Sequence, residues 1–415
     1  MKLLVFAHVP PPHHGQSYMV QLMLNGFGGD RRRRKYQAPN PFGIQCYHVN
    51  ARFSRGLEDI GALQSIKLAR LFLHCLEAIW CRFRHGVECF YYVPAPGKRV
   101  ALYRDWLVML ICRPFFKKVI LHWHAAGLAK WLETAVQIRT RATTYHLFKP
   151  VDLSIVLSQY NFADAEKLLS RRICVVNNGI PDPCPDFAQS VLPRRRARFA
   201  ARTKLFAGGK LEPREIELAG GDPQLVRILF LAHCTREKGL FATMAAVAAA
   251  NRELAARRLP MRMKLRAAGN FVTVAEKLEF DRQMMTPEFA EAVEYLGFVS
   301  GEEKRAALCQ ADVFCFPTRY VGENQPVNLI EAMAFGLPVV TTRWRSLPEM
   351  LPPDSPGLVA DQSPDQITAA LLAVPVQETG ESSRINYLRQ FTVERHLAGL
   401  AEAIGSLDGT QSRPH

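Results

Sequence analysis

Short apolar runs alternate with longer amphipathic segments along the whole sequence, and this alternation constrains the fold more than any other feature. Strands that alternate with helices predict parallel sheets joined by right-handed crossovers. Because the pattern begins again near residue 227, we expect an α/β fold with two Rossmann-like, doubly wound sheets that face each other across a cleft. The expected strands are residues 2–7, 88–93, 118–123 and 153–157, and then 227–232, 263–268, 293–296, 313–316 and 338–341.

The domain organisation follows from the same pattern, since 415 residues are enough for two domains with separate cores. We expect residues 1–185 to form the N-terminal domain and 227–383 the C-terminal domain. Residues 186–226 are rich in Arg, Pro and Gly and have weak apolar periodicity, which predicts a linker with an irregular insertion. Apolar residues at helical spacing over 384–407 predict a C-terminal helix that packs back on the N-terminal domain.

The formal net charge of +15 is unusual for a chain with an ordinary apolar content, and it points to a negatively charged partner. We interpret the basic runs at 31–35 and 194–196 as solvated loops. Nucleic acid is not an expected partner, because the basic residues are not interleaved with stacking aromatic residues. The ten cysteines show no metal-ligand spacing and predict buried thiols in a cytoplasmic protein.

A helix expected over residues 63–83 mixes Leu, Ile and Trp with Lys and Arg. Two interpretations are about equally favoured. The helix lies on an anionic membrane surface, as a peripheral contact on the inner face of the plasma membrane, or it covers the sheet as a crossover helix.

The segment from Glu323 to Glu331 carries the strongest chemical signal. It follows the apolar strand at 313–316, and Pro326 suits the first turn of a helix that Gly336 ends. The free N–H groups of Val327, Asn328 and Leu329 would then face the cleft at the start of this helix. A helix N-terminus is an anion site suited to a diphosphate, and the two carboxylates would accept hydrogen bonds from hydroxyl groups.

These residues resemble the family 4 glycosyltransferases of the GT-B fold, in which two glutamates eight positions apart precede an Ala-rich helix and a Gly-x-Pro-Val-Val strand. The resemblance implies that Glu323 contacts the sugar of a nucleotide-diphosphate-sugar donor and that Glu331 contacts its ribose. It also implies a retaining transfer without a bound metal or cofactor. Lys238 and the following glycine match a second family motif, whose ammonium group neutralises the leaving diphosphate.

Four further residues of the donor side carry the resemblance less closely. His233 stands where the family has an arginine, and either His233 or the nearby Arg236 would contact the phosphate. Phe298 and Val299 follow the strand at 293–296, in a loop that borders the nucleotide base in the family. For Phe298 we favour a place in the core, since a lone phenylalanine is most often buried.

The first half supplies the acceptor side. Gly15 opens a helix after the first strand, where a glycine lets the backbone approach a phosphate or a sugar closely. The alternation of strand residues puts His122 and His124 on one face, with His124 nearest the carboxyl end. His124 resembles the family histidine that faces the donor sugar, whereas we expect His122 to be a core residue. The expected catalytic residues are thus His124, Glu323 and Lys238.

The resemblance implies a retaining glycosyltransferase that serves polysaccharide or cell-envelope biosynthesis. Its acceptor would be a glycan or a lipid-linked glycan. One alternative remains, because His233 and Gln16 depart from the family pattern. It is a non-catalytic nucleotide-sugar-binding scaffold of a glycan assembly complex.

Overall fold

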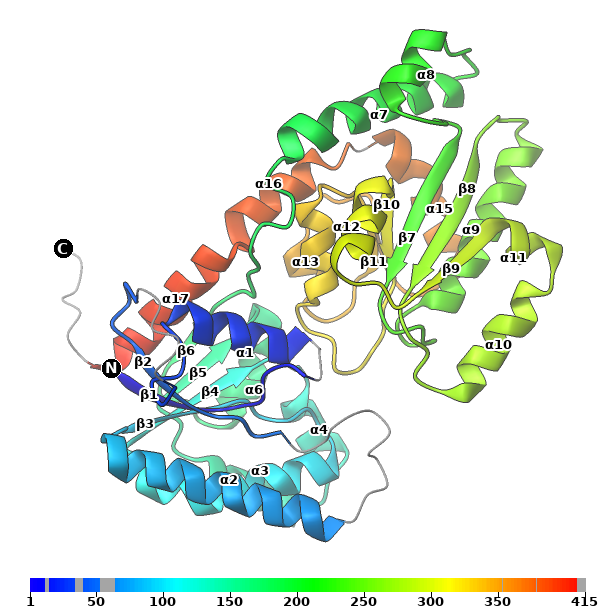
Figure 1. Ribbon diagram of the computed structural model, residues 1–415. Helices are drawn as coiled ribbons and strands as arrows, with labels where there is room; N and C mark the ends of the chain where they lie inside the picture. The colour runs from blue at the N-terminus through cyan, green and yellow to red at the C-terminus, as the bar shows by residue number, and fades with distance from the viewer. Residues whose placement is uncertain (12–14, 34–39, 53–63, 353, 378, 409–415) are drawn as a thin grey trace. The chain divides into compact units, whose positions relative to one another are not determined.

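The computed structural model describes residues 1–11, 15–33, 40–52, 64–352, 354–377 and 379–408. The chain divides into two compact units. The first unit is Met1–Ile180 with Thr392–His415, and the second is Pro181–Phe391. Each unit contains one six-stranded sheet in which all neighbouring strands are parallel, so the expected α/β fold with two parallel sheets is confirmed (Figure 1).

The sheet of the first unit has the strand order β2-β1-β3-β4-β5-β6. Its strands are β1 (Lys2–Phe6), β2 (Gln45–Val49), β3 (Cys89–Tyr92), β4 (Lys118–Trp123), β5 (Leu153–Val156) and β6 (Ile173–Val175). Its helices are α1 (Gly15–Gly26), α2 (Gln64–His85), α3 (Arg99–Cys112), α4 (Leu128–Thr134), α5 (Ile138–Phe148), α6 (Phe162–Lys167) and α17 (Val393–Gly405).

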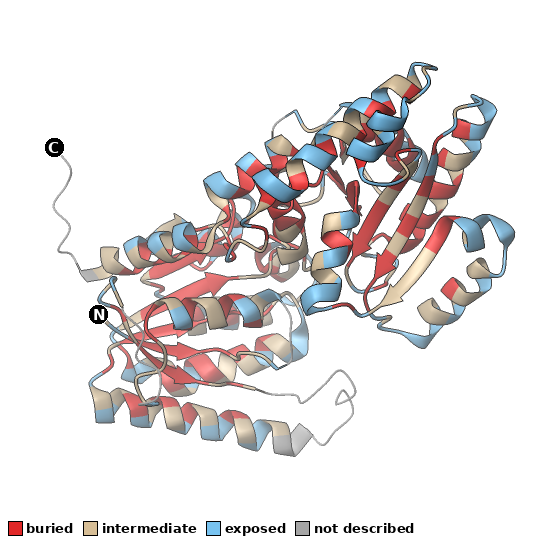
Figure 2. Ribbon diagram, turned by 45° about the horizontal axis from the view of Figure 1, so that its top comes forward, coloured by how far each residue is buried: buried red, intermediate tan, exposed pale blue. Residues whose placement is uncertain are grey.

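Both faces of this sheet are buried. Leu4 and Phe6 of β1 belong to a core that α2 and α3 cover, whereas Leu3 and Val5 belong to a second core that α1 and α17 cover. Successive side chains of a strand point to opposite faces, so a strand buried on both faces appears in the sequence as one continuous apolar run. Figure 2 shows strands of both sheets as buried.

The sheet of the second unit has the order β12-β11-β10-β7-β8-β9. Its strands are β7 (Leu225–Leu231), β8 (Arg262–Ala268), β9 (Val293–Gly297), β10 (Val313–Phe316), β11 (Val339–Thr342) and β12 (Leu358–Val359). Its helices are α7 (Leu192–Phe206), α8 (Pro213–Ala219), α9 (Leu240–Ala256), α10 (Val274–Met284), α11 (Pro287–Ala292), α12 (Gly301–Gln310), α13 (Val327–Ala334), α14 (Leu347–Met350), α15 (Pro364–Gln377) and α16 (Glu381–Gln390). Helices α12 and α13 lie on one side of the sheet, and α9 and α15 lie on the other (Figure 1).

The prediction of a linker over 186–226 is wrong, because this segment contains α7 and α8 and belongs to the second unit. The unit boundary falls at Ile180 rather than at residue 185. Arg195, Arg198 and Arg202 of α7 are buried at helical spacing. The face of α7 that packs inward therefore carries arginines, and a search for apolar periodicity does not find it. The basic run at 194–196 is accordingly part of a helix and not a solvated loop.

The expected single helix over 384–407 is two helices. Helix α16 ends at Gln390 and packs against α13 in the second unit. Helix α17 begins after Thr392, whose hydroxyl accepts a hydrogen bond from the N–H of Arg395, and it packs in the first unit. A Thr at the N-cap satisfies an otherwise unpaired amide and sets the start of a new helix.

Candidate functional site

The loop between β10 and α13 holds the first candidate residue. Strand β10 is fully buried, and Pro326 has an extended backbone directly before the first residue of α13. Gly336 follows the helix with a φ of +59°, a left-handed conformation that ends helices and favours glycine. Within this loop the side chain of Glu323 is buried, so its charge requires partners.

Lys238 is the main partner of Glu323. Its Nζ lies 2.6 Å from Oε2 of Glu323, and the hydroxyl of Thr318 donates to the same oxygen at 3.0 Å. The ammonium group also lies 4.4 Å from the ring centroid of Tyr320. Lys238 follows β7 and Glu323 follows β10, and these strands are neighbours in the sheet. The carboxyl ends of neighbouring parallel strands meet at one edge, which brings together two residues 85 positions apart.

A glycine makes this approach sterically feasible. Gly239 has a φ of +93°, and a Cβ atom at this position would lie 2.6 Å from the carbonyl oxygen of Pro317. The backbone N–H of Arg319 donates to the carbonyl of Glu237 at 2.7 Å, so the two loops are also hydrogen-bonded. The Lys-Gly motif therefore has two parts, a charge at Lys238 and a close backbone contact at Gly239.

The start of α13 is fixed to the end of β7. The side-chain amide of Asn328 donates to the carbonyl of Leu231 at 2.6 Å, and its oxygen accepts the N–H of Leu329 at 2.9 Å. The expectation that the N–H of Leu329 is free for a ligand is therefore wrong, and its side chain is fully buried. Val327 and Asn328 are the first two residues of α13. The backbone N–H groups at the start of a helix have no acceptor within the helix, so these two remain candidates for ligand binding.

Glu331 has a partner that the sequence analysis missed. The Nζ of Lys304 lies 2.6 Å from Oε1 of Glu331, and both side chains are partly exposed. Lys304 belongs to the first turn and a half of α12, which follows the loop containing Phe298. No spacing rule connects residues 304 and 331, so only the packing of α12 beside α13 reveals this second Lys-Glu pair.

The structure separates the two candidates for the missing arginine. The side chain of His233 is only partly covered by its neighbours. This partial burial, and then the positive charge of Lys238, lower the pKa of its imidazole. His233 is therefore neutral at pH 7. Arg236 binds Glu279 of α10, with distances of 2.5 and 2.6 Å to the two carboxylate oxygens. Its guanidinium also lies 5.0 Å from the ring centroid of Phe241. Of the three basic side chains, Lys238 is accordingly the one that forms an ion pair with Glu323.

The loop after β9 contradicts one expectation. Phe298 is 64 % exposed, so the interpretation of Phe298 as a core residue is wrong, whereas Val299 is buried. An exposed aromatic ring directly after a strand end is available to stack on a planar ligand.

In the first unit, Gly15 is the first residue of α1 and is exposed. His124 directly follows β4 and is half-buried, with its ring centroid 4.2 Å from that of His122. His122 is a core histidine, since it is 1 % exposed and its Nδ1 shares a hydrogen bond with the hydroxyl of Tyr91. His396 of α17 completes the cluster, with its ring centroid 6.4 Å from that of His122.

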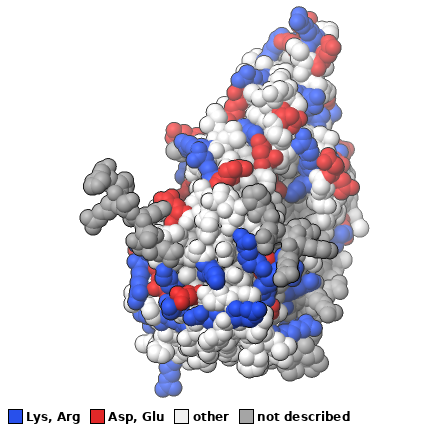
Figure 3. Space-filling view, turned by 60° about the vertical axis from the view of Figure 1, so that its left-hand side comes forward, with Lys and Arg blue, Asp and Glu red and all other residues white. Residues whose placement is uncertain are grey.

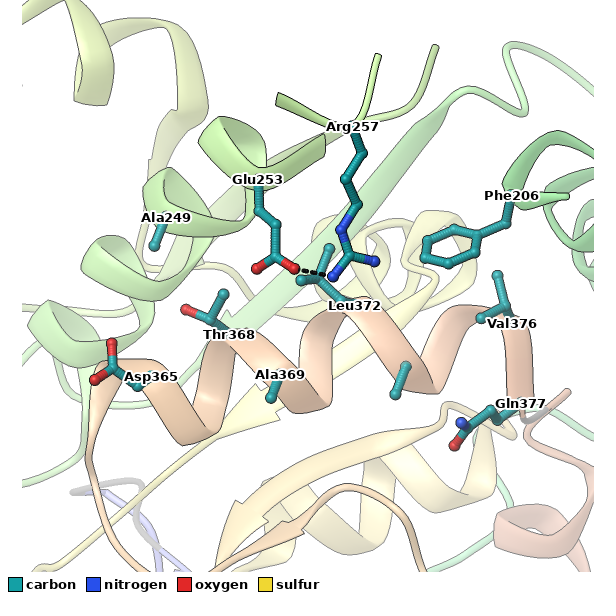
Figure 4. Close-up of a pocket in the computed structure, with 11 residues that line it drawn as sticks. Phe206, Ala249, Glu253, Arg257, Asp365, Thr368, Ala369, Leu372, Val376 and Gln377 are labelled. Atoms are coloured by element: carbon teal, nitrogen blue, oxygen red, sulfur yellow. Dashed lines mark hydrogen bonds and ion pairs between the residues drawn. The ribbon is translucent and has the colours of Figure 1, made fainter. Parts of the chain in front are cut away.

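A separate groove of about 500 Å³ lies along α9 and α15. Ala249, Thr368 and Leu372 line it, and an ion pair between Glu253 and Arg257 borders it (Figure 4). Neither Lys238 nor Glu323 contributes to its lining, so this groove is distinct from the edge of the sheet that carries the candidate site.

No group of three or more His, Cys, Asp or Glu side chains among the described residues is arranged to hold a metal ion. None of the helices described is long and apolar enough to span a membrane.

Solved structures resemble this chain in fold over nearly its whole length. The sucrose-phosphate synthase of Thermosynechococcus elongatus aligns over 99% of this chain and 100% of its own, with a TM-score of 0.63 and 15% identity. HepE of Anabaena, solved in complex with UDP and glucose, aligns over 97% of this chain and 99% of its own, with a TM-score of 0.59 and 13% identity. Together with the two parallel six-stranded sheets, these alignments establish the GT-B fold.

Residues 226–374, which lie in the second unit, match the family model for glycosyl transferases group 1.

Curated relatives are similar over part of their length. The amylovoran biosynthesis glycosyltransferase AmsK of Erwinia amylovora is 27% identical over 47% of this chain and 49% of its own. The MMP α-(1→4)-mannosyltransferase of Mycolicibacterium hassiacum is 29% identical over 52% of this chain and 49% of its own. The chain spans about half the length of the curated relatives that it matches.

Proposed function

We propose that the protein transfers a sugar from a nucleotide-diphosphate-sugar donor to a glycan or lipid-linked acceptor, in polysaccharide or cell-envelope biosynthesis. The observation that carries this proposal is the pair of Lys238 and Glu323 at the carboxyl edge of the second sheet, beside the N-terminus of α13. The match to the group 1 family model and the polysaccharide glycosyltransferases among the relatives support the same reaction class.

The pair of Lys238 and Glu323 suits a nucleotide-sugar donor because each of its charged groups can contact a different part of the donor. A diphosphate beside Lys238 competes with Glu323 for the ammonium group. Oε2 of Glu323, which then loses the ammonium, accepts a hydrogen bond from a hydroxyl of the donor sugar. In the same way, a ribose hydroxyl competes with Lys304 for Glu331. Donor binding thus replaces two internal ion pairs instead of burying new unpaired charges.

The proposed transfer is retaining and uses no metal. Lys238 and the first amides of α13 supply the positive charge that the leaving diphosphate needs as the sugar bond breaks. The acceptor hydroxyl attacks from the face that the diphosphate leaves, so the anomeric configuration is kept without a protein nucleophile. His124 of the first unit is the proposed partner of the sugar hydroxyls, and Gly15 is the proposed point of close backbone approach.

A non-catalytic scaffold is the second candidate function, and the neutral state of His233 favours it. A histidine whose pKa is lowered adds no positive charge at pH 7 where the family has an arginine. Less positive charge then stabilises the negative charge of the leaving diphosphate. Under this alternative, the protein binds a nucleotide sugar without turning it over.

A panel of nucleotide sugars separates the two candidates. We expect one nucleotide sugar to raise the melting midpoint, because a ligand at about 100 times its Kd stabilises the folded state by about 2.7 kcal/mol. The same sugar should be hydrolysed slowly and transferred to a glycan acceptor. Binding without any hydrolysis or transfer would identify a scaffold, and no binding by any member of the panel would contradict both functions.

Variants then test the residues. Glu323→Gln keeps the shape of the side chain but removes its charge, and we expect turnover to fall by about 100-fold or more. Glu291→Gln removes an exposed carboxylate from α11 and serves as the matched control, with turnover expected to stay at the wild-type level. Equal turnover in both variants would remove Glu323 from the site.

A further inference from the structure

Helix α2 has two apolar faces. Leu71, Cys75, Ala78 and Cys81 pack into the core of the first unit, so the helix covers the sheet as a crossover helix. The opposite face is also apolar but exposed, by between 45 % and 68 % of each side chain. Its residues are Leu68, Phe72, Leu73, Leu76, Trp80 and Phe83. A helix that only covered a sheet would carry polar residues on this second face.

Helix α3 extends the same apolar surface. It packs beside α2, and Val100, Tyr103 and Leu110 are exposed along one stripe of it. Phe115, which follows α3, is also exposed, and its ring centroid lies 6.0 Å from that of Phe83. We call the nine exposed side chains of the two helices, together with Phe115, the α2–α3 face. Contiguous exposed apolar surfaces of this kind are rare unless they bind something.

The charges around the α2–α3 face are almost all positive. Residues 64–118 contain ten Lys or Arg and only three Asp or Glu. Each of the three carboxylates is already paired: Glu77 with Arg32, Glu88 with Lys117 and Asp105 with Arg104. On the lower part of the surface in Figure 3, Lys and Arg side chains outnumber Asp and Glu beside a broad uncharged area.

From this combination we infer that the α2–α3 face docks on an anionic lipid bilayer surface. Apolar side chains that enter the interface and basic side chains that meet anionic headgroups are the two contributions that hold a helix in the plane of a membrane. Trp80 and Tyr103 have the amphipathic rings that favour the headgroup level.

A second copy of the chain fits this surface less well. In a two-fold dimer the same patch of each copy meets itself, so the positive charges that flank the face would oppose one another. An anionic bilayer instead complements both the apolar residues and the charge. The inference does not depend on the proposed sugar transfer, because no residue of the α2–α3 face belongs to the candidate donor site.

Co-sedimentation with lipid vesicles tests the inference on the full chain. We expect binding at low salt to vesicles that mix phosphatidylcholine with phosphatidylglycerol, and little binding to phosphatidylcholine alone. In the triple variant Phe72→Gln, Leu76→Gln, Trp80→Gln, the partition coefficient on the mixed vesicles should fall by roughly tenfold or more. The double variant Lys67→Gln, Arg84→Gln should reduce the preference for the anionic lipid.

A control on the second unit makes the result specific. The triple variant Val274→Gln, Leu278→Gln, Met285→Gln also replaces three exposed apolar residues, around α10, and should bind vesicles as the wild type does. The melting midpoint of each variant shows that it is folded. Equal vesicle binding by the wild type and the α2 variant would overturn the inference.

Light scattering and nucleotide-sugar stabilisation complete the experiment. A dimer that the α2 variant dissociates, in a protein that ignores vesicles, would assign the face to a second copy and overturn the inference. Loss of vesicle binding with intact donor stabilisation concerns the α2–α3 face alone, whereas loss of donor binding with intact vesicle binding concerns the proposed function.

Discussion

The side chains of the candidate donor site neutralise one another in pairs. Lys238 binds Glu323 and Lys304 binds Glu331, each at 2.6 Å. The sequence predicts both glutamates and Lys238, because they stand in motifs with fixed spacing. It does not predict Lys304 or the buried hydroxyl of Thr318, because their contacts arise from the packing of separate elements. At the scale of single residues, motifs therefore identify the groups that we propose to contact a ligand better than the groups that hold those side chains in place.

The first residue-scale prediction concerns Gly239. Gly239→Ala should destabilise the protein by about 2 kcal/mol or more, because a φ of +93° strains an alanine and its Cβ would lie 2.6 Å from the carbonyl oxygen of Pro317. Donor stabilisation should weaken as well, since the loop carries Lys238. Gly208→Ala is the matched control: its φ is +79° but nothing lies within 4 Å, so only the backbone strain, about 1 kcal/mol, applies. Urea unfolding of both variants measures the difference, and equal losses would show that the contact with Pro317 is unimportant.

The second prediction concerns the buried histidines of the first unit. Burial lowers the pKa of His396 to about 4, although its hydrogen bond to the carbonyl of Asn177 opposes this shift. Burial, and then the neighbouring His124 and His396, lower the pKa of His122 as well. Below pH 6.5 the unfolded state binds protons that the folded state does not, so the free energy of unfolding should fall as the pH decreases toward 4.

His396→Asn isolates one part of this dependence. Asparagine keeps a donor for the carbonyl of Asn177 but does not titrate. Between pH 6.5 and pH 5 the variant should lose about 2 kcal/mol less than the wild type, since one pKa unit corresponds to about 1.4 kcal/mol. His146→Asn replaces an exposed histidine of α5 and serves as the control. The same slope in all three proteins would contradict the assignment.

At the scale of elements, α7 shows a helix whose buried face is made of arginines. Arg198 donates to the carbonyl of Ala219, and Arg202 donates to the carbonyls of Pro223 and Leu225. Both also bind Asp312, the residue before β10, with distances of 3.1 and 2.8 Å. The arginine stems cover apolar surface while their guanidinium groups satisfy backbone carbonyls, so a cationic face is compatible with burial.

Asp312 should therefore be essential to this arrangement. Its burial raises the pKa of its carboxyl, but the charges of Arg202 and Arg198 outweigh burial and hold the pKa below the usual value. Asp312→Asn leaves two buried cations without their counter-ion and should destabilise the protein by about 3–5 kcal/mol. The stability from this carboxylate is present at neutral pH and is lost as the pH falls through its folded pKa. Chemical unfolding at pH 7 measures the loss; Asp222→Asn, at a half-exposed position, should cost less than about 1 kcal/mol.

The elements that the sequence analysis missed have a common cause. Strands β2, β6 and β12 went unpredicted, and each lies at an edge of its sheet. Central strands are buried on both faces and appear as continuous apolar runs, whereas β6 and β12 have only three and two residues. Strand β2 contains Gln45 and His48, which interrupt its apolar pattern. The sequence thus predicts the central strands of both sheets and one edge strand, β9, but misses the other three edge strands.

At the scale of the whole molecule, the chain passes from the first unit to the second after Ile180 and returns after Phe391. The residues of the candidate donor site belong to the second unit, and the histidine cluster belongs to the first. A nucleoside diphosphate should therefore slow amide hydrogen exchange in the loops at 235–240 and 318–330. It should leave the strands of the first unit unchanged. Protection confined to the first unit would contradict the placement of the donor site.

The return of the chain after Phe391 has a consequence for biosynthesis. Leu400, Ala403 and Ile404 of α17 belong to the same buried cluster as Leu3 and Val5 of β1. These two parts of one core are about 400 residues apart in the chain, so the ribosome makes β1 long before it makes α17. The nascent first unit therefore presents an uncovered apolar surface while the entire second unit is being made. Premature termination anywhere before α17 would leave this surface bare, which makes incomplete chains ready substrates for chaperones and proteases.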